Sequence, residues 1–296
     1  MKKLITSHCR DPYVIRHNNK YYRCFSFGAS SIGVAYADTI DALRDAEPIT
    51  VYTAPAGTAY SKELWAPELH IIDGKCYIYV ACDDGENRNH RMYVLENNSD
   101  DPAAPYTMHS QITDPTDKWA IDGTVMPLGG KMYFIWSGWE GDVNVCQNLY
   151  IAEMADPFTL CGERHLLSVP TFEWEKRGAS DTLPLINEGP FAFKHNGKQY
   201  LTYSASGSWC EHYCIALLEL TGDNPLKQNS WHKYPAPILC TNEQVKGAGH
   251  CSLLMDEDGT HVFFHAWDKE ETNICWNTVA LWHGHLAEEN GRLIIL

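Results

Sequence analysis

Basic side chains are scarce in this sequence, and their scarcity limits the partners that the protein can bind. Lys and Arg together number 23 against 38 Asp and Glu in 296 residues, which gives a formal net charge of -15. A surface with this excess of negative charge repels phosphate backbones and anionic lipid head groups. We therefore expect neither a nucleic-acid partner nor a membrane partner, whereas a neutral ligand such as a sugar is compatible with the charge.

Paired cysteines and long apolar runs are also absent. The 11 Cys are an odd number and are scattered singly, as at Cys9, Cys24 and Cys76, without Cys-x-x-Cys spacing. This pattern argues against a disulfide framework and structural zinc, and it predicts reduced thiols in a cytoplasm. Polar residues follow Met1–Ile5 at once, so we expect no signal peptide and no membrane span, although a trimmed export signal would leave the same sequence.

One short phrase occurs five times along the chain: a turn-forming pair, usually followed by Lys, and then a run rich in aromatic and β-branched residues. The copies are Asn18–Tyr22, Asp73–Tyr77, Gly129–Tyr133, Asn196–Tyr200 and Asp258–Val262. Asn-Gly, Asp-Gly and Gly-Gly pairs favour the positive φ angles of two-residue hairpin turns. Each copy therefore predicts a β-hairpin.

The spacing of these hairpins predicts the fold. Positions 20, 75, 131, 198 and 260 are 55 to 67 residues apart, which is about one four-stranded propeller blade with its loops. Further short strands are expected at Gly33–Ala37 and Met92–Leu95, and helix only around Asp41–Arg44. We predict an all-β, five-bladed β-propeller that forms a single catalytic domain over residues 1–296; a β-sandwich with similar turns is the alternative.

The repeat also locates a candidate site, because the innermost strands of all blades meet around one axis. Ionisable residues lie 7 to 10 positions before the five hairpins, each beside a Pro or a Gly: Asp11, Glu68, Asp122, Glu188 and His250. Crowded carboxylates raise one another's pKa, so one stays protonated as an acid while another stays ionised as a base. Hydrolysis of a glycosidic bond requires this pair, one to protonate the leaving oxygen and one to activate water.

Several of these residues have a second interpretation. Glu68, whose offset of 7 departs most from the others, is either a substrate contact or a buried structural partner, for example of Arg10. No second His or Cys at ligand spacing supports zinc at His250, whereas a hard cation held mostly through water is compatible with the channel. The aromatic planes of Trp65, Trp139 and Trp209, near the predicted channel-end loops, suit sugar rings but equally suit packing between blades.

Five short motifs, in this order along the chain, resemble those of glycoside hydrolase family 43, the five-bladed propeller enzymes that act on arabinofuranosides and xylosides. They are Arg10-Asp11-Pro12, Trp65-Ala66-Pro67-Glu68, Ile121-Asp122-Gly123, Glu188-Gly189-Pro190 and Gly247-Ala248-Gly249-His250. The resemblance spans Arg10 to about Trp267. It implies that Asp11 is the general base, that Glu188 is the general acid, and that Asp122 tunes the pKa of the acid and helps to orient it.

The same resemblance implies an inverting mechanism with no required cofactor, and a water-coordinated structural calcium ion in the channel near His250, where Ala248 and Cys251 depart from the family's small polar context. The stretch from Ile186 to Gly207, with Trp209 beyond it, looks more like exo-acting α-L-arabinofuranosidases than like β-D-xylosidases. The expected activity is release of arabinose from arabino- or arabinoxylo-oligosaccharides. A β-D-xylosidase of the same family and a non-catalytic carbohydrate-binding propeller are the alternatives.

Overall fold

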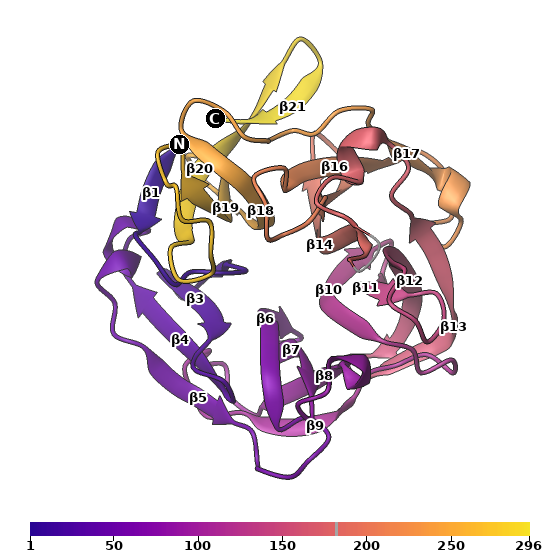
Figure 1. Cartoon of the computed structure of the whole chain (residues 1–296). Coiled ribbons are helices and arrows are strands. Elements are labelled where there is room, and N and C mark those ends of the chain that lie inside the picture. Colours follow the sequence, from indigo (N-terminus) through magenta and orange to yellow (C-terminus); the bar gives the residue numbers. More distant parts are fainter. Residues whose placement is uncertain (181–182) are drawn as a thin grey trace.

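The computed structural model describes residues 1–180 and 183–296, and it consists almost entirely of β-strands grouped into five blades around an axis (Figure 1). The first strand of every blade contacts the first strands of the two neighbouring blades, so that β2, β6, β10, β14 and β18 form a closed ring. This arrangement confirms the predicted five-bladed propeller and excludes the β-sandwich.

The first four blades are antiparallel meanders of four strands each. Blade one contains β2 (Tyr13–His17), β3 (Lys20–Ser26), β4 (Ser31–Ala37) and β5 (Ile49–Thr53). Blade two contains β6 (Lys62–Ile72), β7 (Lys75–Asp83), β8 (Arg91–Asn97) and β9 (Thr107–Gln111). Blade three contains β10 (Ala120–Leu128), β11 (Lys131–Trp139), β12 (Cys146–Asp156) and β13 (Thr159–Ser168). Blade four contains β14 (Leu185–His195), β15 (Lys198–Ala205), β16 (Cys214–Leu220) and β17 (Trp231–Lys233).

Blade five is built from both ends of the chain. Its strands are β18 (Val245–Asp256), β19 (Gly259–Asp268), β20 (Ala280–Glu289) and, outermost, β1 (Lys2–Ile5). The short strand β21 (Arg292–Ile295) pairs with the far end of β20. Because β1 is hydrogen-bonded to β20, the N-terminus closes the ring, and the two chain ends lie near each other (Figure 1).

Four of the five predicted hairpin turns form as the sequence indicates, with both central residues at positive φ, as in Asp73 (50°) and Gly74 (76°). The fifth differs, because Asp256 pairs with Gly259 and the turn consists of Glu257 and Asp258. The little helix present is 3-10 in type, and it includes the predicted segment: η1 (Asp41–Arg44), η2 (Asn87–Asn89), η3 (Glu173–Glu175) and η4 (Gln228–Ser230). No helix in the described part of the chain is long and apolar enough to span a bilayer.

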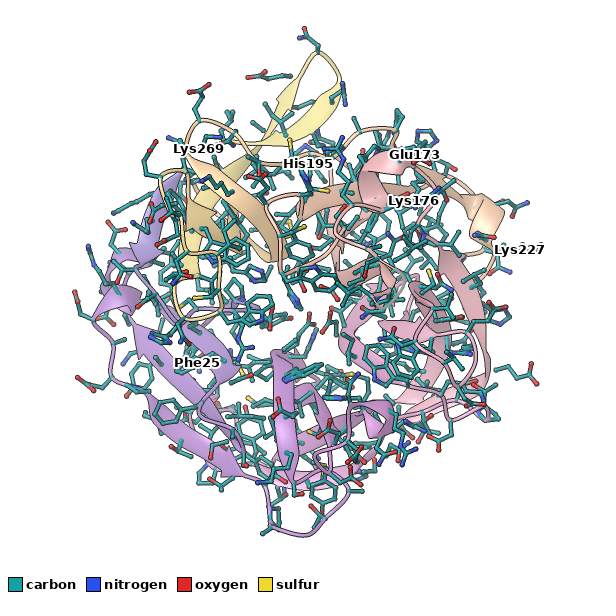
Figure 2. The ribbon with its side chains drawn as sticks, in the orientation of Figure 1. Phe25, Glu173, Lys176, His195, Lys227 and Lys269 are labelled. Carbon is teal, nitrogen blue, oxygen red and sulfur yellow. The ribbon has the colours of Figure 1, made fainter. Side chains whose placement is uncertain are left out.

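The hydrophobic core is divided among the spaces between blades, which side chains fill (Figure 2). Each of five buried apolar clusters belongs to one pair of neighbouring blades. The cluster between blades five and one has six buried members among the described residues, including Leu4, Val14 and Phe263, whereas the other four have 13 to 18. All eleven cysteines are unpaired, as their spacing predicted.

Candidate active site at one end of the channel

A distortion of the innermost strands recurs at an equivalent position in all five blades. The first strands of blades two to five carry irregularities in register, and blade one has a comparable turn just before β2. A residue with positive φ occurs at an equivalent position in each blade, namely Asp11, Ala66, Asp122, Gly189 and His250, and Glu63 and Gly247 are further positive-φ residues in blades two and five. Each of the five equivalent residues lies nine positions before the residue that begins the second strand of its hairpin: Lys20, Lys75, Lys131, Lys198 and Gly259.

This common register corrects the alignment predicted from the sequence. The residue of blade two that is equivalent to Asp11 is Ala66, not Glu68, and that of blade four is Gly189, not Glu188. Three ionisable side chains, those of Asp11, Asp122 and His250, therefore share one position in their blades. Glu188 reaches the same pocket from the position before the bend.

Asp11 is enclosed by two imidazoles of blade five. His250 Nδ1 lies 3.1 Å from Asp11 Oδ1, and His265 Nδ1 lies 3.4 Å from the same oxygen. Burial by itself would raise the pKa of the Asp11 carboxyl, but the imidazoles outweigh it and hold this pKa well below its usual value. In turn, the Asp11 and Asp122 carboxylates outweigh burial and raise the pKa of His250 to about 10. Asp11 is therefore ionised at neutral pH.

Asp122 lies between the other ionisable groups. Its Oδ2 accepts a hydrogen bond from the Gly189 N–H (3.0 Å) and lies 3.8 Å from His250 Nδ1. Burial raises the pKa of Asp122 to about 6, with His250 opposing the shift and Asp11 adding to it. Because the Gly189 N–H directly follows Glu188, this hydrogen bond also fixes the backbone that carries Glu188.

Glu188 has the opposite electrostatic setting to Asp11. Its side chain is buried, and Oε1 accepts a hydrogen bond of 2.8 Å from the Tyr213 hydroxyl. Burial, followed by repulsion from Asp122, raises the pKa of Glu188 to about 8, although Tyr213 and His250 oppose this. Glu188 is therefore largely protonated at pH 7, in the same pocket as an ionised Asp11.

Glycines let these groups approach one another. A Cβ atom on Gly249 would lie 1.8 Å from the Tyr213 ring, so only glycine leaves room for Tyr213 to reach Glu188. A Cβ on Gly189 would come within 3.1 Å of the His250 ring, at a backbone φ of 53°. Gly249 and Gly189 thus serve the packing of the site.

The four central groups line a cavity of about 300 Å³. Among its other lining residues are Arg10, Trp65, Trp119, Gln147, Trp209 and Trp276. The Trp65 indole stacks on the His90 ring at 4.1 Å, and the Trp209 indole N–H donates to the Gly178 carbonyl. Trp276 lies under the guanidinium of Arg10 at 5.5 Å. The cavity combines aromatic walls with a few converging polar groups, as expected of a small-molecule site.

Two residues expected to contact substrate lie outside this cavity. Glu68 is only 5% exposed and its Oε2 is 2.8 Å from His70 Nε2, so its structural partner is His70 rather than Arg10. Trp139 is buried against Trp119, with ring centroids 4.7 Å apart and nearly parallel planes. Glu68 is two residues beyond the bend of its blade, and Trp139 is separated from the cavity by Trp119.

The structure adds His265 and Tyr213 to the residues proposed from the sequence. His265 is the cross-strand partner of Gly249, the residue before His250. Its position in the second strand of that hairpin could have been used to predict it as a site residue. Tyr213 directly precedes β16, and nothing in its local sequence distinguishes it from a strand residue.

His250 does not have the surroundings of a metal ligand. Its Nδ1 faces Asp11 and Asp122, and its raised pKa keeps the ring positively charged, which repels a cation. Among the described residues, the groups able to hold one ion with three or more ligands do not include it. The imidazolium already supplies the positive charge that a cation would bring to these carboxylates, so the residues present do not fit a calcium ion bound directly to His250.

Comparisons with known proteins give matches over most of this chain. The model of the family described as glycosyl hydrolases family 43 matches residues 3–280. An extracellular exo-α-(1→5)-L-arabinofuranosidase of Streptomyces avermitilis is 33% identical over 259 residues, covering 84% of this chain and 52% of the relative. A protein of the same name from Streptomyces chartreusis is 32% identical over 256 residues, covering 84% and 76%.

A solved structure of an α-L-arabinofuranosidase from Lactobacillus brevis superposes with a TM-score of 0.86 at 30% identity, covering 98% of this chain and 94% of that one. The chain spans about half the length of the Streptomyces avermitilis relative, 52%.

Proposed function

The chain belongs to glycosyl hydrolase family 43, and from this premise we propose that it is an inverting, exo-acting α-L-arabinofuranosidase that releases arabinose from arabino- or arabinoxylo-oligosaccharides. One observation carries the proposal: Asp11 and Glu188 line the same cavity with pKa shifts of opposite sign. A base and an acid are thus both in their active protonation states at neutral pH.

In the proposed reaction, the oxygen of a water molecule attacks the anomeric carbon while Asp11 accepts a proton from that water molecule. Glu188 gives its proton to the leaving glycosidic oxygen. Asp11 therefore gains one proton and Glu188 loses one. Asp122 holds the Gly189 N–H, which orients Glu188, and its negative charge helps to keep Glu188 protonated. Attack by water on the face opposite to the leaving group inverts the anomeric configuration.

The cavity supports action on a chain end and on a furanoside. Its volume of about 300 Å³ lies at the small end of the range for ligand pockets, which suits one or two sugar units rather than a polymer segment. The names of all three relatives described above refer to arabinofuranosidases. Trp65 and Trp209 are the proposed aromatic contacts of the sugar rings.

Two alternative functions are a β-D-xylosidase of the same family and a non-catalytic binding propeller. A binding propeller has no need for two carboxyl groups held in opposite protonation states, so the arrangement of Asp11 and Glu188 argues against it. The xylosidase reading differs only in the sugar, and it has to be tested with substrates.

The test compares hydrolysis of nitrophenyl α-L-arabinofuranoside and nitrophenyl β-D-xylopyranoside by the purified chain. Asp11→Asn and Glu188→Gln are each expected to lower turnover of the arabinoside by about 10²- to 10⁴-fold without loss of folded protein. Glu173→Gln, a matched change at an exposed residue, is expected to retain the activity. Unchanged turnover in both pocket variants would remove the enzyme assignment, and preference for the xyloside would replace the proposed sugar.

The anomeric outcome is tested separately by NMR of the first sugar released. Inversion is expected, and a retained configuration would contradict a role for Asp11 in activating water.

The cytoplasmic location expected from the sequence stays a prediction, and the names of the two Streptomyces relatives, which include the word extracellular, point to another compartment. The channel calcium ion likewise stays a prediction, one that would have to involve water rather than direct contact with His250.

A further inference from the structure

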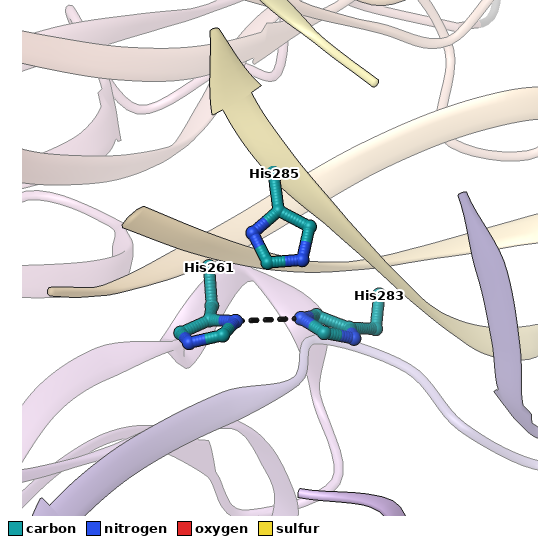
Figure 3. A group of neighbouring side chains, drawn as sticks. All are labelled: His261, His283 and His285. Carbon is teal, nitrogen blue, oxygen red and sulfur yellow. Dashed lines mark hydrogen bonds between the residues drawn. The ribbon is translucent and has the colours of Figure 1, made fainter. Parts of the chain in front are cut away.

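Three histidines of blade five meet away from the proposed active site. His261 lies on β19, and His283 and His285 lie two residues apart on β20, so both project from the same face of that strand. His261 pairs across the sheet with His285. Figure 3 shows the three rings turned towards one another, and one ligating nitrogen from each lies within 4.8 Å of the others.

The closest pair has the spacing of two ligands of one ion. His261 Nδ1 and His283 Nε2 are 2.9 Å apart (Figure 3). Two nitrogens bound to one metal at about 2.0–2.1 Å, with an angle between 90° and 109°, lie about 2.9–3.4 Å from each other. A metal ion can therefore be placed between these rings with little movement of the strands.

Asp258 prepares His261 for this role. Its Oδ1 lies 2.9 Å from His261 Nε2 and accepts a hydrogen bond from the N–H of this nitrogen. The Nδ1 atom that faces His283 is then left with its lone pair, and a carboxylate that orients a histidine in this way is the usual outer partner of a metal ligand.

We propose that His261, His283 and His285 bind a divalent transition-metal ion of the kind that prefers imidazole, such as Ni²⁺ or Zn²⁺, with Asp258 as the outer carboxylate. Imidazole ligands select such ions over Ca²⁺ and Mg²⁺, which take oxygen ligands. His285 is exposed, so an ion can enter from solvent and water can complete its coordination.

The charges near the site are compatible with a cation. Lys2 is paired with Asp41 at 2.7 Å, and Arg16 is paired with Asp256. Asp258 contacts His261 directly, and a carboxylate oxygen of Asp256 lies within 4.8 Å of the ligand atoms of both residues.

The position of the site indicates a structural role. His283 is the cross-strand partner of Lys2 in β1, the strand by which the N-terminus closes the propeller. The apolar cluster between blades five and one is also the smallest of the five. His261 is four residues from the pocket residue His265 on the same strand, about 13 Å away, so the ion would stabilise ring closure without touching the reaction.

The experiment uses the full chain without a histidine tag, because a tag would itself bind the metal. Isothermal titration with NiCl₂ is expected to show one site, and Tm is expected to rise by roughly 4–8 °C at a free metal concentration about 100-fold above Kd. His285→Ala, at an exposed position, should weaken binding by more than about 100-fold, and Asp258→Asn by about 10- to 100-fold.

The matched control is His212→Ala, which removes an exposed histidine from blade four and should leave both the affinity and the Tm shift unchanged. His283→Gln, which keeps the bulk of a partly buried side chain, tests the second ligand of β20. No metal-dependent rise in Tm in the unaltered chain would overturn the proposal. The same rise in His285→Ala and Asp258→Asn would also overturn it, because the metal would then be bound elsewhere, for example by the free cysteines.

Discussion

Replacing Tyr213 with Phe is expected to move the alkaline limb of the pH profile of kcat/KM to higher pH. The Tyr213 hydroxyl donates to Glu188 Oε1 at 2.8 Å, and this bond stabilises the ionised carboxylate and so lowers its pKa. Tyr213 has a pKa raised well above 10 by burial and by Glu188, so it stays a donor throughout the range of interest. Without the hydroxyl, Glu188 should hold its proton to higher pH.

The size of the shift follows from the strength of that bond. A hydrogen bond to a charged group contributes about 1.5–3 kcal/mol, and one pKa unit corresponds to about 1.4 kcal/mol, so the pKa of Glu188 should rise by about one to two units. The limb set by a pKa of about 8 in the unaltered chain should therefore move to about pH 9 or above. Because an acid catalyst works when protonated, activity is lost as pH rises through this value and is retained below it.

The assay is the pH dependence of kcat/KM for nitrophenyl α-L-arabinofuranoside, measured beside Tyr203→Phe. Tyr203 is a matched control, because its hydroxyl donates at 2.9 Å to another buried carboxylate, that of Glu175, outside the cavity. That variant should be less stable but should keep the alkaline limb. An unmoved limb in Tyr213→Phe, or one moved to lower pH, would refute the assignment of Glu188 as the titrating acid.

Three further changes have expected outcomes. Asp122→Asn removes the charge that helps to raise the pKa of Glu188, so the alkaline limb should move to lower pH, opposite to Tyr213→Phe, in the same assay. Glu175→Gln leaves the half-buried Lys233 without its ion-pair partner, so it should lower the free energy of unfolding by about 3–5 kcal/mol. Urea denaturation measures this change, and a loss below about 1 kcal/mol would contradict the expectation. Trp209→Ala should lower kcat/KM by about 10- to 100-fold, as expected for about 1.5–3 kcal/mol of lost aromatic contact, and an unchanged value would remove Trp209 from the substrate site.

Much of the fold could be predicted from local chemistry. The pairs Asn18-Asn19, Asp73-Gly74, Gly129-Gly130 and Asn196-Gly197 all form the turns that their residue types favour, because positive φ is cheap for Gly and Asn. Asp258-Gly259 does not, because the hairpin there turns one residue earlier, which made the offset of His250 look one residue too long.

The candidate site could be predicted only in part for a similar reason. Counting back from a hairpin assumes unbroken strand register, and the bends of the inner strands break it. Ala66 therefore occupies the place assigned to Glu68, whereas Glu188 is in the pocket although it is one position out of phase. Trp139 illustrates a second limit, because a tryptophan that lines a cavity and one that packs behind it occur in similar sequences.

The amino-acid sequence by itself determined the five hairpins, the number of blades and three carboxylates near one axis, since turn propensity, strand periodicity and repeat spacing are local properties of the chain. The tertiary structure decided which groups touch. Only the closed ring places His265 and His250 of the last blade on Asp11 of the first, and only the folding of blade four places Tyr213 on Glu188. The opposite pKa shifts of the two carboxyl groups arise from these contacts and from burial, because electrostatic effects depend on distance in space and not on separation along the chain.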